Sequence, residues 1–162
     1  MRLGQYQNAI TDLWAAIRHD TGNAQYYSSL ARCNQELGQI TDALSNYAEA
    51  IRNSGKDQGE IATIYLERGL LYSKQGKYVD AIQDFETAIT NAISKKSDRA
   101  PLFDLYLEKG RCHRRLGQFE QSIHDLSLSV EKQKTNQNNK VTAVALNDLG
   151  LSHFEFAQYE TA

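Results

Sequence analysis

Apolar residues recur at intervals of three and four residues along nearly the whole chain. This spacing is typical of amphipathic α-helices and not of strands, which alternate with a period of two. Short polar interruptions divide the pattern into pairs of helices. The first helix of each pair is expected at 24–37, 62–75, 103–116 and 143–156. The second helix is expected at 5–20, 39–53, 77–94, 118–130 and 158–162.

The junction between the two helices of a pair repeats along the chain at intervals of about 34 to 41 residues. A bulky residue follows each junction by two positions and a small residue by five. Ala31, Gly69, Gly110 and Gly150 precede the later junctions by seven, and we expect these small residues to let the two helices of a pair approach closely. The junction residues are Gly4, Gly38, Gly76, Gly117 and, in a fifth copy, Ala157. Glycine suits such a turn because it adopts the left-handed conformation without a Cβ penalty. One helix pair cannot bury its apolar face alone, so we expect the units to stack.

The turn glycine, the small residues and the aromatics that recur at equal distances from each junction resemble the repeat pattern of the tetratricopeptide repeat (TPR) family. The resemblance implies an all-α, right-handed superhelical solenoid of antiparallel helix pairs, truncated at both ends. It covers a single array over 1–162, with units at about 1–23 (partial), 24–57, 62–95, 103–136 and 143–162 (partial). The proline that often ends a TPR unit is missing, so the second helices of units three and four should run longer. Cut ends would expose apolar surface and permit end-to-end self-association.

Composition narrows the class of function. The 162 residues carry a net charge of −2 with a pI near 6.1, which argues against a nucleic-acid-binding domain. A mean hydropathy of −0.58, with no long apolar run, argues against membrane insertion. Two cysteines are too few for a disulfide framework and favour a reducing, cytoplasmic location. No nucleophile elbow, phosphate loop or metalloprotease motif occurs, so neither an enzyme nor a cofactor is predicted.

The resemblance places the first helices along a concave groove. The groove residues expected to contact a partner are Arg32, Gln35, Leu70, Lys74, Arg111, Arg114, Arg115, Asn147 and Phe154. They predict a scaffold or adaptor that binds a protein or peptide segment with acidic and apolar residues. Alternatively, the three arginines from 111 to 115 form a solvated face balanced by Asp104 and Glu108. A second candidate function is a structural spacer in a ciliary, transport or secretion assembly, which would use its edges and convex face.

A second charge pattern indicates bonds within units three and four. Eight residues before the turn glycine, these units carry Arg68 and Lys109, and eight residues after it they carry Asp84 and Asp125. Unit two has Leu30 and Asn46 at the same places, so the cation and the aspartate appear and disappear together. We predict the salt bridges Arg68–Asp84 and Lys109–Asp125, which would tie the two helices of each pair together.

The remaining candidate chemistry is sparse. Cys33 and Cys112 share a column beside the small-residue column, which predicts a buried packing role. His113 and His153 also share a column on first helices, where they could approach each other in the groove. A metal site would need further ligands, and none converge in the sequence.

Overall fold

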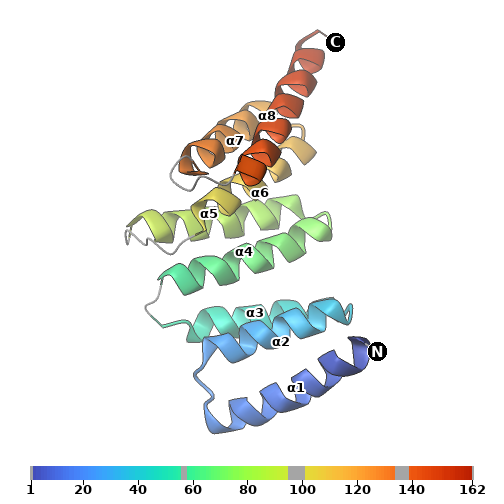
Figure 1. Cartoon of the computed structure of the whole chain (residues 1–162), viewed down its shortest axis with the longest axis vertical. Coiled ribbons are helices and arrows are strands. Elements are labelled where there is room, and N and C mark those ends of the chain that lie inside the picture. The colour runs from blue at the N-terminus through green and yellow to red at the C-terminus, as the bar shows by residue number, and fades with distance from the viewer. Residues whose placement is uncertain (1, 56–57, 95–100, 134–138, 162) are drawn as a thin grey trace.

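The computed structural model describes residues 2–55, 58–94, 101–133 and 139–161. Within these ranges the chain forms eight α-helices and no strand, stacked as successive antiparallel hairpins (Figure 1). The predicted all-α solenoid is confirmed. The helices are α1 (Arg2–His19), α2 (Ala24–Glu36), α3 (Ile40–Asn53), α4 (Gln58–Lys74), α5 (Tyr78–Ser94), α6 (Leu102–Arg115), α7 (Phe119–Gln133) and α8 (Asn139–Glu160).

Three of the predicted glycine turns close the hairpins α2–α3, α4–α5 and α6–α7. Gly38, Gly76 and Gly117 have φ values of 74°, 73° and 72°, in the left-handed region where other residues are strained. The residue after each glycine donates its N–H to the carbonyl five residues earlier, at 2.8 to 3.0 Å. This hydrogen bond satisfies a carbonyl that would otherwise be left open at the end of the first helix.

Small residues bring the two helices of a hairpin together, as the sequence predicted for units three and four. A Cβ added at Gly69 would collide with the ring of Phe85, and one at Gly110 would lie 2.8 Å from Leu126 Cγ. Phe85 and Leu126 are fully buried, and Tyr47 occupies the same position in α3. The prediction of close contact is wrong for Gly150, where an added Cβ would meet no described atom within 4 Å.

Both predicted salt bridges within hairpins are confirmed. Arg68 donates to the two carboxylate oxygens of Asp84 from Nε at 2.8 Å and from Nη2 at 2.6 Å. Lys109 Nζ lies 3.3 Å from Asp125 Oδ1, and it also pairs with Glu86 on α5 at 3.3 Å. The pairs therefore join α4 to α5 and α6 to α7 through side chains that are mostly buried.

Two predicted turns are wrong. Gly4 lies inside α1 and lacks the positive φ that Gly38, Gly76 and Gly117 have at their turns, so the helix continues through it. The expected turn at Phe156–Tyr159 is absent, and α8 continues through it. Ala157 stands in place of glycine there. Alanine has the highest helix propensity and resists the left-handed conformation, so the helix extends.

The predicted lengthening of units three and four is divided between their helices. At 17 residues, α5 is about one turn longer than α3 with 14, which confirms the expectation for unit three. Unit three also lengthens α4, which begins at Gln58 instead of residue 62. In unit four α7 has 15 residues, and the rest of its expected extension falls on 134–136, outside the described residues.

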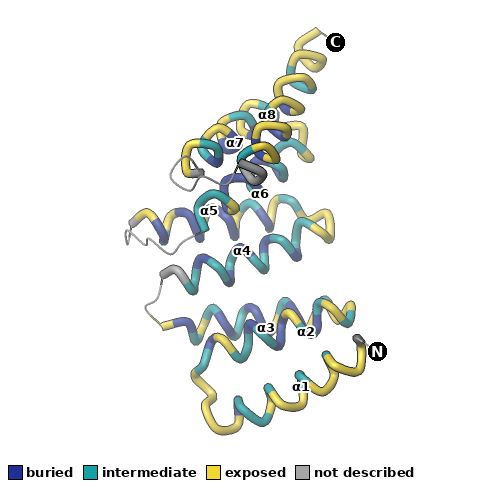
Figure 2. Tube along the Cα trace, in the orientation of Figure 1, coloured by how far each residue is buried: buried dark blue, intermediate teal, exposed yellow. Residues whose placement is uncertain are grey.

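Burial is concentrated in the central hairpins. Buried positions follow each other along the facing sides of α2 to α7, whereas α1 and the C-terminal half of α8 are largely exposed (Figure 2). Alanines at the contact seams, such as Ala31, Ala43 and Ala81, are completely buried. This buried middle section positions the first helices that carry most of the predicted groove residues.

Candidate partner-binding groove

A cleft of about 370 Å³ lies between the first helices α2 and α4, with one residue each contributed by α1 and α3. Four of the predicted partner-binding residues line it, namely Arg32 and Gln35 on α2 and Leu70 and Lys74 on α4. The complete lining is Tyr6, Arg32, Gln35, Glu36, Tyr47, Glu67, Leu70 and Lys74. The structure thus brings together residues that are far apart in sequence but occupy equivalent faces of neighbouring first helices.

An ion pair crosses this cleft. Arg32 Nη2 donates to Glu67 Oε1, and Ser28 Oγ donates to Glu67 Oε2 at 3.2 Å. The hydrogen bond with Glu67 is the main reason that the pKa of the Arg32 guanidinium lies above its ordinary value. Glu67 was not among the predicted groove residues. It neutralises Arg32 and links α2 to α4.

The cleft combines an apolar floor with one unpaired cation. Tyr47 is buried beneath it, and burial raises the pKa of its hydroxyl well above the ordinary value, so the phenol stays neutral. Leu70 is half-buried and Tyr6 adds an aromatic surface. Lys74 is exposed at the rim and has no ion-pair or hydrogen-bond partner among the described residues. A ligand with an apolar side chain next to a carboxylate would match these groups.

The arginine cluster on α6 is engaged mostly within the protein. Arg111 pairs with Asp148 on α8 at 2.7 Å and with Glu108 at 2.6 Å, while Arg114 pairs with Glu155 on α8 at 3.0 Å. Burial is the main cause that raises the pKa of the Glu108 carboxyl, and Arg111 opposes it. Arg115 alone is exposed without a partner among the described residues. The groove around α6 is therefore less positively charged than the sequence suggested.

Arg32 and Arg111 make the same contact in two different places. Each lies six residues before its turn glycine and binds an acid on the next first helix, Glu67 or Asp148. Leu70 occupies this place on α4, which leaves Glu108 without a cation from the preceding unit. Glu108 pairs with Arg111 on its own helix instead. A comparison of equivalent positions in neighbouring units, in addition to positions within one unit, would have found this contact.

The last two predicted groove residues lie away from the cleft, on α8. Asn147 is exposed, and Phe154 is 61% exposed beside the exposed Leu151. Near its end, the ring of Tyr159 lies against that of Phe119 on α7, with centroids 6.0 Å apart. Leu151 and Phe154 therefore form an exposed apolar strip on α8, one of the first helices that the resemblance places along the groove.

The histidines and cysteines do not form a site. His113 Nδ1 lies 2.7 Å from Gln118 Oε1 and Nε2 lies 3.5 Å from Asp125, which places it inside the α6–α7 hairpin and not in the groove with the exposed His153. Cys112 is buried and Cys33 partly buried, and burial raises the pKa of both thiols. In the described part of the chain, no group of three or more His, Cys, Asp or Glu could hold a metal ion. Of the helices described, none combines the length and apolar character needed to cross a bilayer.

Comparison with known families and structures agrees with this architecture. Two tetratricopeptide repeat family models match, over residues 20–94 and 66–136. A search of curated proteins finds no match to this sequence.

Among solved structures, BtubC from P. vanneervenii is similar with a TM-score of 0.78 at 18% identity, over 95% of this chain and 65% of that one. The chain thus spans less than two thirds of that protein. MamA has a TM-score of 0.67 at 22% identity, over 86% of this chain and 70% of that one. YrrB, a TPR protein with an unusual peptide-binding site, has a TM-score of 0.62 at 21% identity, over 90% of this chain and 71% of that one. At these identities the similarity concerns the fold.

Proposed function

Because this chain belongs to the tetratricopeptide repeat family, we propose that it is a non-enzymatic scaffold that binds a segment of a partner protein in the cleft between α2 and α4. The observation that carries this proposal is the cleft itself, where Leu70 offers an apolar contact beside the unpaired ammonium of Lys74. The bound segment would place an apolar side chain on Leu70 and a carboxylate at Lys74. Two free cysteines fit a reducing, cytoplasmic setting for this role.

The three arginines of α6 have unequal parts in this proposal. Arg111 and Arg114 hold α8 in place, so they would shape the groove more than they would contact a ligand. Arg115 is equivalent in position to Lys74, two residues before the turn glycine, and like Lys74 it has no partner among the described residues. A partner segment that extends beyond the cleft toward α6 would contact Arg115.

A selection from a random peptide library tests the proposal. We expect selected peptides to carry Asp or Glu close to an apolar residue, and Lys74→Glu to weaken their binding about five- to tenfold, because attraction is replaced by repulsion. Lys77→Glu is the matched control, since Lys77 is also exposed but lies outside the cleft lining. If Lys74→Glu and Leu70→Ala both leave the affinities of the selected peptides unchanged, the cleft is not the binding site.

The alternative of a structural spacer, which would use the edges and the convex face of the array, is supported by a different observation: Val79 and Ile93 are exposed on the second helix α5. A spacer would bury this face against a neighbouring component and leave the cleft unoccupied. Hydrogen exchange in the presence of a partner distinguishes the two functions. Protection confined to the second helices α3, α5 and α7 favours the spacer, and protection of α2 and α4 favours the groove.

A further inference from the structure

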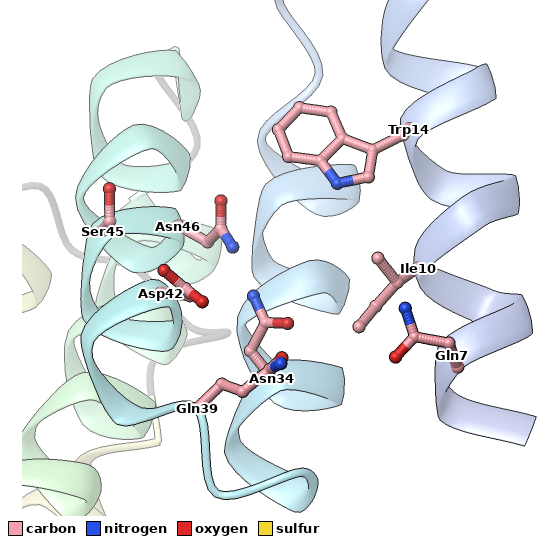
Figure 3. Close-up of a pocket in the computed structure, with 8 residues that line it drawn as sticks. All are labelled: Gln7, Ile10, Trp14, Asn34, Gln39, Asp42, Ser45 and Asn46. Atoms are coloured by element: carbon pink, nitrogen blue, oxygen red, sulfur yellow. The ribbon is translucent and has the colours of Figure 1, made fainter. Parts of the chain in front are cut away.

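A second cleft, of about 380 Å³, lies between α1 and α3 with α2 at its base. Figure 3 shows Trp14 and Ile10 entering it from α1, and Asp42 and Asn46 facing them from α3. Its lining is Gln7, Ile10, Trp14, Asn34, Gln39, Asp42, Ser45 and Asn46. Asn34 lies about 200° around α2 from Arg32 at 3.6 residues per turn. This second cleft is therefore separate from the groove proposed above.

Two nearly buried carboxamides in this cleft have unused hydrogen-bonding groups. Asn34 is 7% exposed and Asn46 is 8% exposed, and both side chains point into the cleft (Figure 3). Neither carboxamide forms a hydrogen bond with another described residue. Neither carboxamide is among the fully buried polar groups without a partner, so both reach the open side of the cleft. Their oxygens are thus accessible to a hydrogen-bond donor that enters the cleft. Asp42 at the rim is exposed and likewise has no partner in the described part of the chain.

The other hairpins show what occupies the equivalent place. Asp84 and Asp125 stand where α3 has Asn46, and each receives a cation from its own first helix, Arg68 or Lys109. The Arg68 guanidinium also lies over the rings of Tyr65 and Tyr72, 5.3 and 6.0 Å from their centroids. The α2–α3 hairpin has Leu30 at that position and can supply no cation.

We propose that this cleft binds an arginine side chain of a partner protein. The guanidinium would donate to the amide oxygens of Asn34 and Asn46 and pair with Asp42, and it would stack on the partly exposed indole of Trp14. Arginine fits better than lysine because its planar head carries five donors and stacks on aromatic rings. An apolar side chain would leave both carboxamides unsatisfied. The partner would thus supply a cation to Asn46 from the side of the cleft, because the buried Leu30 fills the place that Arg68 has in the α4–α5 hairpin.

The single tryptophan of the chain reports on this cleft directly. The test titrates the protein with an acetylated and amidated Gly-Arg-Gly peptide at low salt, while the fluorescence and the indole N–H resonance of Trp14 are followed. We expect a saturable response in the millimolar range, and a response at least fivefold weaker with citrulline or lysine in place of arginine. Absence of a saturable response, or equal responses to the three peptides, would overturn the proposal.

Two matched variants locate the binding. Asp42→Asn is expected to weaken binding of the arginine peptide about two- to fivefold, which corresponds to the energy of an exposed ion pair. Asp80→Asn changes the equivalent exposed residue of α5, outside this cleft, and should have no effect. Both positions are exposed, so folding should be unaffected, which far-UV circular dichroism checks. Equal affinity for the parent and Asp42→Asn would overturn the assignment. Since no Asp42 or Trp14 contact enters the groove proposal, that result would leave the α2–α4 cleft untouched.

Discussion

Replacement of Arg68 by leucine should destabilise the protein strongly, because the change leaves a buried carboxylate without its cation. The side chain of Asp84 is 6% exposed and that of Arg68 is 19% exposed, with two hydrogen bonds of 2.6 and 2.8 Å between them. Breaking a buried pair costs about 3–5 kcal/mol, and the partial exposure of Arg68 favours the lower end, about 3 kcal/mol. At ~2–4 °C per kcal/mol for a chain of this size, Tm should fall by roughly 6–12 °C.

The α2–α3 hairpin provides a natural control for this substitution. It carries Leu30 and Asn46 at the positions of Arg68 and Asp84 and folds without the ion pair. The double variant Arg68→Leu/Asp84→Asn should therefore recover most of the loss, to within about 1 kcal/mol of the parent. The free energy of unfolding would be measured by urea denaturation followed by far-UV circular dichroism.

The pH dependence gives an independent check. Burial raises the pKa of the Asp84 carboxyl above its ordinary 3.8 even though Arg68 opposes the shift, and loss of Arg68 should raise it further. A carboxyl whose pKa is higher in the folded state stabilises the fold when protonated, and this contribution is lost as pH rises through the folded pKa. The loss of unfolding free energy caused by Arg68→Leu should thus be largest near pH 7 and become smaller toward pH 4. The reasoning is refuted if Arg68→Leu costs less than about 1 kcal/mol, or if the double variant is no more stable than the single one.

Three further predictions concern packing and stacking. Gly69→Ala should destabilise the protein by about 1–3 kcal/mol, because the added methyl group would overpack the contact with Phe85. Gly150→Ala lies in open space within a helix and should stabilise the protein by about 0.5–1 kcal/mol. Urea denaturation of both variants compares the two effects directly. Gly76→Ala should cost about 1–2 kcal/mol because φ is +73° there, measured as a lower urea midpoint with unchanged helix content. Arg111→Leu should leave Asp148 unpaired and speed hydrogen exchange in α8 at least tenfold more than in α2; equal exchange in both helices would contradict the role of this contact.

Contacts within a repeat could be predicted from the sequence because each hairpin has the same geometry. Equal offsets from the turn glycine place Arg68 opposite Asp84 and Lys109 opposite Asp125, whatever the stacking of the units. The turns at Gly38, Gly76 and Gly117 followed from the same regularity.

Contacts between repeats could not be predicted from the positions within a single unit, since they join residues at different offsets in neighbouring units. The pairing of Arg32 with Glu67 is the clearest example, because the two residues stand at different offsets in their own units. The continuation of α8 through Ala157 was missed for another reason. There the column pattern indicated a turn, while the local propensity of alanine favoured a helix, and the local preference prevailed.

The buried ion pairs also restrict how such an array can be rearranged in evolution. Repeats multiply by recombination, and a crossover at the turn Gly76 would join α4 to a helix like α3, so that Arg68 would face an asparagine. The reciprocal product would bury an aspartate opposite a leucine, with the penalty of an unpaired charge. A crossover in the connectors between hairpins keeps each cation with its own acid. Viable recombination breakpoints should therefore lie in the connectors, and a hairpin should be inherited as one unit.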